Sequence, residues 1–83
     1  FMALPYGDRE WMAQSRQDVL DAAKAHDNVY IADWCGHAQA HQDMLFEDGV
    51  HPMPEGAQEY AKAFDEALAQ AADHKKKTTT TCA

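Results

Sequence analysis

Apolar positions along the chain fall into patterns that predict two strands and two helices. Residues 1–4 (FMAL) are a short apolar run typical of the end of a strand, and the turn sequence PYGD at residues 5–8 offers Asp8 as a helix cap. A helix is expected next, because apolar and small side chains recur at helical spacing until Asp27 and Asn28 interrupt the pattern. The positions on this face are Trp11, Ser15, Val19, Ala22, Ala23 and His26.

The order of strand and helix is repeated in the second half of the pattern. Residues 29–34 (VYIADW) are β-branched and aromatic without polar alternation, which is typical of a strand that is covered on both faces and paired in parallel. Pro54 suits the first position of a helix, and the stretch from there to about Ala72 carries one apolar stripe. The stripe consists of Ala57, Tyr60, Ala61, Phe64, Leu68 and Ala71.

This order of elements predicts an α/β fold with βαβα connectivity. A strand, a helix and a second strand within about thirty residues form a right-handed βαβ unit, with the helix on one face of a parallel sheet. In open sheets of this kind, ligand-binding groups gather beyond the carboxyl ends of the strands. The segment from Cys35 to Gly56 leaves the second strand at that edge, so we expect its polar residues to carry the chemistry.

Length and charge narrow the classes of function. A chain of 83 residues makes at most one small domain, and its apolar opening, FMALPYG, indicates a fragment of a longer polypeptide. Fourteen acidic residues against seven basic ones give a net charge of −7, and three of the basic residues are the consecutive Lys75, Lys76 and Lys77. The chain therefore lacks the basic stripe that binding to nucleic acids requires. Anionic membranes are excluded as binding partners for the same reason. No apolar run approaches the roughly 20 residues of a membrane span.

The two cysteines and the end of the chain indicate neither a metal site nor a reactive thiol. Cys35 and Cys82 are too few and too far apart for a disulfide framework or a zinc knuckle, and nothing near Cys35 is basic enough to activate its thiol. We therefore predict that Cys35 is a structural thiol. The final sequence, HKKKTTTTCA, is low-complexity and polar, so residues 73–83 are expected to be a disordered tail.

The most informative stretch is EDGVHPMPEG at residues 47–56. A carboxylate that accepts a hydrogen bond from one nitrogen of an imidazole fixes the tautomer in which the other nitrogen acts as a general base. Asp48 and His51 are spaced to do this, while Gly49 permits a tight turn and Pro52 restrains it. The pair predicts the acid and base that activate a nucleophile, but no nucleophile is evident in the chain.

Three other interpretations of the polar residues remain open. Asp48 could simply cap a turn, with His51 as a surface histidine. His37 and His41 are four residues apart with Asp43 just beyond, so these three side chains are an alternative metal site, above all for zinc. The chain could also be an acidic, non-catalytic interaction module, which explains its charge but not the Gly-x-His-Pro turn.

The aromatic side chains are predicted to pack in the core, because each buries a large area. Trp34 is the exception, since it is expected to end the second strand at the functional edge of the sheet. There it is a candidate substrate-site residue, whose ring could form the base of a sugar or acyl site. The predicted core set is Trp11, Phe46, Tyr60 and Phe64.

Two segments resemble the SGNH (GDSL-like) hydrolase superfamily. DGVHPMPEGAQEYAKAF is similar to its last block, Asp-Gly-x-His-Pro followed by a glycine and a helix. DREWMAQSRQDVLDAAKAHDNVYIADW resembles the preceding helix and strand in the branch attached to peptidoglycan O-acetyltransferases and related surface acyltransferases. The resemblance covers residues 1–72 and implies a βαβα C-terminal fragment of a flavodoxin-like three-layer α/β/α domain with a parallel sheet.

The resemblance also implies what the complete parent protein does. It would be a serine-dependent esterase or O-acyltransferase that moves an acetyl group to or from a cell-wall or other carbohydrate hydroxyl, without a cofactor. Asp48 matches the triad acid and His51 the general base, whereas the serine belongs to an earlier block that has no counterpart here, so this chain alone should be inactive. The expected partners are an acyl ester or carbohydrate substrate, the missing N-terminal part of the same domain and an upstream membrane acyltransferase domain. The expected location is extracytoplasmic.

Overall fold

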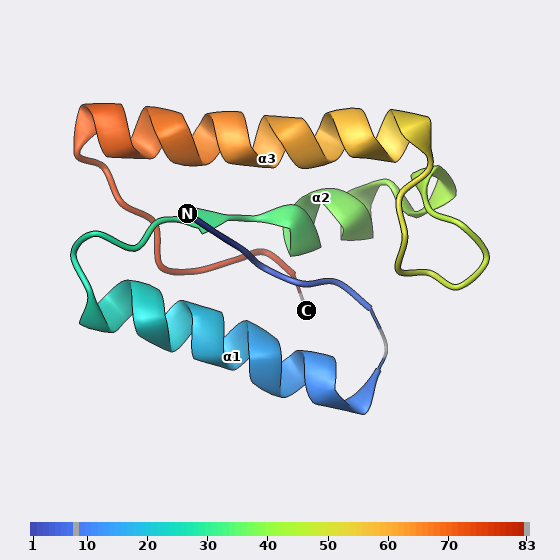
Figure 1. Cartoon of the computed structure of the whole chain (residues 1–83), viewed down its shortest axis with the longest axis horizontal. Helices are drawn as coiled ribbons and strands as arrows, with labels where there is room; N and C mark the ends of the chain where they lie inside the picture. The colour runs from blue at the N-terminus through green and yellow to red at the C-terminus, as the bar shows by residue number, and fades with distance from the viewer. Residues whose placement is uncertain (8, 83) are drawn as a thin grey trace.

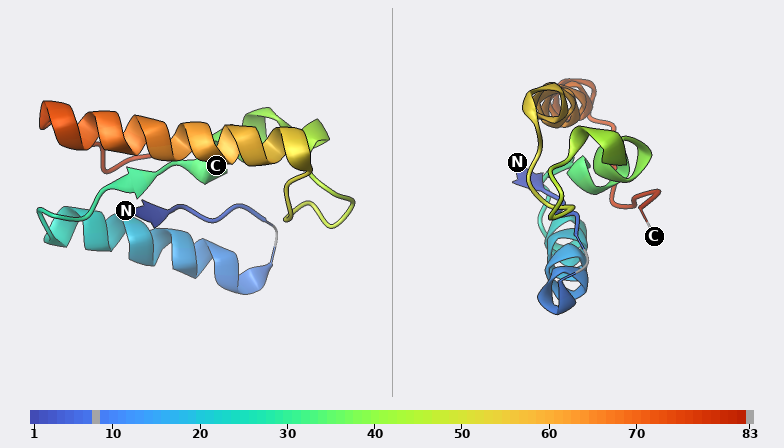
Figure 2. Two further views of the ribbon diagram at one scale, coloured as in Figure 1. Left: turned by 45° about the horizontal axis from the view of Figure 1, so that its top comes forward. Right: turned by 90° about the vertical axis from the view of Figure 1, so that its right-hand side faces the viewer.

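Helices form most of the regular structure in the computed structural model, which describes residues 1–7 and 9–82. Among these residues there are three α-helices, of 16, 7 and 20 residues, and two strands of two residues each. Helix α3 lies on one side of a central layer made by the strands and α2, and α1 lies on the other (Figures 1 and 2). In chain order the elements are β1 (Met2–Ala3), α1 (Glu10–Ala25), β2 (Ile31–Ala32), α2 (Trp34–Ala40), the 3-10 helix η1 (Gln42–Met44) and α3 (Pro54–Asp73).

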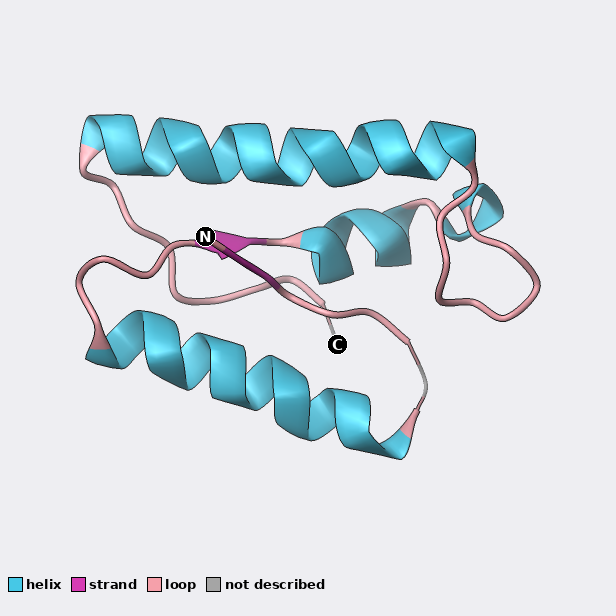
Figure 3. Cartoon of the chain, viewed as in Figure 1, coloured by secondary structure: helices cyan, strands magenta, loops and turns pink. Residues whose placement is uncertain are grey.

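The predicted fold class, a βαβα fragment of a flavodoxin-like α/β/α domain, is wrong. The strands are present and parallel, with Met2 paired to Ile31 and Ala3 to Ala32, but they are too short to make the expected sheet (Figure 3). The second strand ends early because Asp33 begins a helix: its carboxylate accepts a hydrogen bond from the backbone N–H of Gly36 at 3.0 Å. Helix α2 therefore occupies the place where a strand end and a loop were expected.

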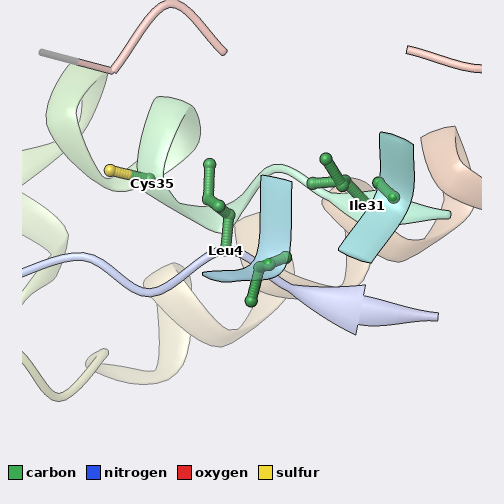
Figure 4. Close-up of a cluster of buried hydrophobic side chains, with 5 residues drawn as sticks. Leu4, Ile31 and Cys35 are labelled. Carbon is green, nitrogen blue, oxygen red and sulfur yellow. The ribbon is translucent and has the colours of Figure 1, made fainter. Parts of the chain in front are cut away.

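The buried face of α1 includes Val19 and Ala23 as predicted, but Met12 takes the place expected for Trp11. Met12 is 4% exposed, whereas Trp11 is 61% exposed. Met12 fits inside because Gly7 has no side chain to obstruct it. The candidate cap Asp8 lies outside the described residues, and Arg9 takes the N-cap position without a side-chain hydrogen bond. The core cluster between α1 and the strands, partly visible in Figure 4, consists of Leu4, Val19, Ala23, Ile31 and Cys35.

Helix α3 begins at Pro54 as predicted, but its buried face is also rotated from the predicted stripe. Leu68 is 53% exposed, and Ala57 and Ala61 are exposed as well. Close approach selects the observed face, since Ala63 and Ala67 pack directly on Ala32 of β2. The small side chains of Ala63 and Ala67 allow α3 to approach β2 more closely than larger side chains at these positions would allow. The buried residues of α3 are Gly56, Glu59, Ala63 and Ala67.

The C-terminal segment turns back from α3 toward the central layer (Figure 1). Cys82 forms a disulfide with Cys35, so the prediction of an unpaired structural thiol at Cys35 is wrong. The hydroxyl of Thr80 donates to Asp33 Oδ1 at 2.8 Å, which places this segment beside the start of α2. The division into residues 1–72 and a disordered tail at 73–83 stays a prediction. No helix in the described part of the chain is both long and apolar enough to cross a membrane.

Candidate Asp-His site

A loop between η1 and α3 carries Asp48 and His51. Its base is closed by two backbone hydrogen bonds, from Met53 N–H to the Met44 carbonyl at 2.8 Å and from Phe46 N–H to the His51 carbonyl at 2.9 Å. Between them, Leu45 and Pro52 form an isolated antiparallel bridge. The loop projects from the end of the molecule at which α3 begins (Figures 1 and 3), so its tip is open to solvent.

The tip of the loop is shaped by Asp48 and Gly49. Gly49 has a φ of 68°, a left-handed conformation that glycine adopts without a steric cost. Asp48 Oδ1 accepts hydrogen bonds from the backbone N–H groups of Val50 at 2.9 Å and His51 at 3.1 Å. Such a side-chain cap replaces backbone pairing in a tight turn. The turn is therefore determined by contacts among four consecutive residues.

The other carboxylate oxygen of Asp48 faces the imidazole of His51. Oδ2 lies 2.5 Å from Nδ1, so the predicted hydrogen bond between the two side chains is present. This hydrogen bond, followed by those from the N–H groups of Val50 and His51, holds the pKa of Asp48 well below its usual range. The carboxylate thus stays ionised at neutral pH and orients the ring, while the His51 side chain remains 74% exposed.

Asp48 also lines a hollow of about 300 Å³ beside the loop. Its other lining residues come from the N-terminal segment, from η1 and from the loop itself: Tyr6, Gly7, Gln42, Glu47 and Gly49. Among residues 1–7 and 9–82, no hydroxyl or thiol is hydrogen-bonded to His51, and Cys35 is held in its disulfide. In the part that the structure describes, the Asp48–His51 pair therefore has no hydroxyl or thiol partner.

Trp34, the candidate substrate-site residue, begins α2 instead of ending a strand. Its side chain is 5% exposed, and its ring lies 5.1 Å from that of Tyr60, measured between centroids. With Ala38 and Leu45 it forms a core cluster beneath the loop. A contact between Trp34 and substrate stays a prediction, although the ring supports α2 and α3 in this structure. Of the other aromatic side chains, Phe46 is 54% exposed, so it does not join the core as predicted.

The alternative metal site at His37, His41 and Asp43 is not assembled. Both ring nitrogens of His37 are occupied by carboxylates of α3, with Nδ1 2.9 Å from Glu59 Oε2 and Nε2 2.8 Å from Glu66 Oε1. His41 lies farther from the same Glu59 oxygen, at 3.8 Å. Within residues 1–7 and 9–82, no three His, Cys, Asp or Glu side chains are grouped so that they could hold a metal ion.

The ion-pair cluster of His37, Glu59, Lys62 and Glu66 was missed by the sequence reasoning. A signal was available, because Glu59 and Glu66 are seven residues apart and so share a face of α3. Glu59 also falls in register with the small residues Gly56 and Ala63. A charged residue within a face of small residues indicates that a partner of opposite charge reaches it from another element.

Comparison with known proteins yields a partial match. No protein-family model matches the chain, and no solved structure matches it significantly. Over 49 residues the chain is 37% identical to a Bacillus subtilis (strain 168) protein named "Putative peptidoglycan O-acetyltransferase YrhL". The match covers 59% of this chain and 8% of the relative, so the chain spans a small part of that protein's length.

Proposed function

We propose that this chain is part of an enzyme related to peptidoglycan O-acetyltransferases and contributes the acid and base of an SGNH-type Ser-His-Asp triad. The proposed parent transfers an acyl group, most simply acetyl, to or from a carbohydrate hydroxyl of the cell wall. Its location is extracytoplasmic. Its serine, and the membrane acyltransferase domain that would deliver the acyl group, lie in other parts of the parent.

The observation that carries this proposal is the geometry of the loop. Asp48 binds Nδ1 of His51, so Nε2 is the nitrogen available to take a proton from a serine hydroxyl. The serine oxygen then attacks the acyl carbonyl, and the imidazolium returns its proton to the departing alkoxide. In the second half, the base takes the proton of water or of a sugar hydroxyl, whose oxygen attacks the acyl-serine carbonyl. The acyl–serine bond breaks, the imidazolium gives its proton to the departing serine oxygen, and the free acid or the acylated sugar leaves. The partial similarity to a protein named as a peptidoglycan O-acetyltransferase supports acyl transfer as the chemistry.

The test is made in the complete parent protein, with release of p-nitrophenol from p-nitrophenyl acetate as the readout. His51→Ala should reduce turnover to background, and Asp48→Asn should slow it by about 10⁴-fold, as when a triad acid is replaced by its amide. The matched controls are His26→Ala and Asp43→Asn, which make the same changes outside the loop tip. Both controls should retain activity.

Two outcomes would defeat the proposal. One is full activity of the Asp48→Asn and His51→Ala parents. The other is hydrolysis that is abolished by a chelator and by Asp43→Asn, because that result would show that a metal bound near His37 and His41 catalyses the reaction. The 83-residue chain on its own should not hydrolyse the ester, since a base without a nucleophile has nothing to activate.

A further inference from the structure

His37 joins α2 to α3 between two carboxylates. His37 lies one turn before the end of α2, and both of its ring nitrogens are within hydrogen-bonding distance of glutamates on α3. The His37 side chain is 19% exposed and that of Glu59 is 11% exposed, so this contact lies largely inside the helix interface. Its position matters because α2 and α3 flank the loop that carries Asp48 and His51.

This arrangement requires a charged imidazole. A neutral imidazole has one N–H group, so it can donate to one glutamate only and must turn a lone pair toward the other. The imidazolium donates from both nitrogens, and each donation to a carboxylate is then charge-assisted. The two distances, 2.9 Å to Glu59 and 2.8 Å to Glu66, therefore describe the protonated form of His37.

The charged groups around His37 favour the same form. Glu59 and Glu66 face the ring from α3, and Lys62 lies beyond, 2.8 Å from the second oxygen of Glu59. From the side of α2, His41 is 3.8 Å from Glu59, and Asp33 lines the same hollow as His37. Burial lowers the pKa of His37, but the hydrogen bonds and charges of Glu59 and Glu66 outweigh it, so its pKa is raised above 6.5.

We propose that protonated His37 clamps α2 to α3 and thereby positions the loop of residues 45–53, and that loss of this proton loosens the loop. The clamp concerns the helix pair alone, so it does not depend on the proposed catalytic function. The backbone hydrogen bonds of Phe46 and Met53 close the base of this loop, so the exchange rates of these two amide protons report directly on whether the loop is held in place.

The pH window follows from the two partners. The pKa of His37 is raised in the folded protein. Protonated His37 therefore makes its full contribution to the stability of the α2–α3 contact below pH 6.5, and this contribution is lost as pH rises through the folded pKa. Glu59 has a pKa lowered from 4.5 to about 2, first by the hydrogen bond from Lys62 and then by that from His37. Its contribution is complete above pH 4.5 and is lost as pH falls toward 2. The clamp is therefore strongest between these limits, in mildly acidic solution.

The experiment uses the 83-residue chain, with EDTA present to exclude adventitious metal. Imidazole NMR resonances are followed from about pH 4 to pH 9, and amide exchange is measured at Phe46 and Met53. His37 should titrate at higher pH in the wild type than in Glu66→Gln. Exchange at Phe46 and Met53, corrected for its intrinsic pH dependence, should accelerate as His37 loses its proton, whereas exchange in the middle of α1, at Val19, should not.

The control for Glu66→Gln is Asp65→Asn, which removes the same charge from the adjacent exposed position of α3. It should leave the His37 titration and the loop amides unchanged. Glu66 is an exposed residue, so Glu66→Gln should retain the fold. The proposal is overturned if Glu66→Gln and Asp65→Asn act alike, or if exchange at Phe46 and Met53 does not respond to the titration of His37.

Discussion

Asp48 is bound by His51 at two points, through the backbone N–H to Oδ1 at 3.1 Å and through ring Nδ1 to Oδ2 at 2.5 Å. The first contact shapes the turn, and the second orients the imidazole. An amide at residue 48 can still accept from the backbone N–H groups, but its NH₂ group cannot accept from Nδ1–H. The two roles can therefore be separated by one substitution.

Asp48→Asn should change the tautomer of His51 while it preserves the turn. In the wild type the carboxylate selects the Nδ1–H form of the neutral ring, and loss of this acceptor should increase the Nε2–H form. Long-range ¹H–¹⁵N NMR of the imidazole measures the ratio directly. The control is Asp43→Asn, and an unchanged tautomer in Asp48→Asn would mean that the carboxylate does not orient the ring.

The loop should also lose its turn in acid. The lowered pKa of Asp48 means that its contribution to stability is present above its usual value of 3.8 and is lost as pH falls through the folded value below it. The amide protons of Val50 and His51 should consequently stay hydrogen-bonded at pH 3.8, as judged by the temperature coefficients of their NMR shifts. Loss of both hydrogen bonds well above that pH would contradict the assignment.

Gly56→Ala should destabilise the junction between the loop and α3. A Cβ at this position would lie 2.6 Å from the carbonyl oxygen of Met44 and 2.9 Å from Cβ of Pro52, which leaves no room for a methyl group. We expect a loss of about 1–3 kcal/mol in the free energy of unfolding, measured with urea. Ala57→Gly, on the exposed side of the same turn, should cost about 1 kcal/mol through helix propensity alone and leave the Met53 amide protected.

His74→Gly should stabilise the end of α3. His74 is the C-cap and has a φ of 54°, a left-handed conformation that is unfavourable for a residue with a Cβ. Glycine adopts this conformation readily, so the free energy of unfolding should rise by about 1 kcal/mol, which is measured as a higher thermal midpoint. Asp73→Gly, one residue earlier and inside the helix, should lower the midpoint instead.

Reduction of the Cys35–Cys82 disulfide should destabilise the chain. The bond closes a loop across a sequence separation of 47 residues, and the loss of such a link commonly costs about 2–5 kcal/mol. Urea unfolding with and without dithiothreitol measures the difference, and Cys82→Ser should be insensitive to the reductant. Incorporation of two carbamidomethyl groups into the unreduced protein, seen by mass spectrometry, would show that the bond is absent.

The sequence by itself determined the elements whose interactions are local. Pro54 marks the start of α3, and the Asp48 turn depends on hydrogen bonds that reach no farther than His51, so both could be predicted from neighbouring residues. The parallel pairing of β1 and β2 was also predictable, because two apolar segments flank a helix of the length needed for a crossover. The catalytic role of Asp48 and His51 stays a prediction.

Only the tertiary structure decided which faces meet and how far the strands extend. Asp33 caps α2 and ends β2, a competition between helix and strand that the pattern of the six residues VYIADW does not resolve. The buried face of α3 was decided by the close approach of Ala63 and Ala67 to Ala32. His37 of α2 and Glu59 of α3, and likewise Cys35 and Cys82, come from distant positions in the chain. Such contacts follow from packing geometry, which the periodicity of any single segment does not contain.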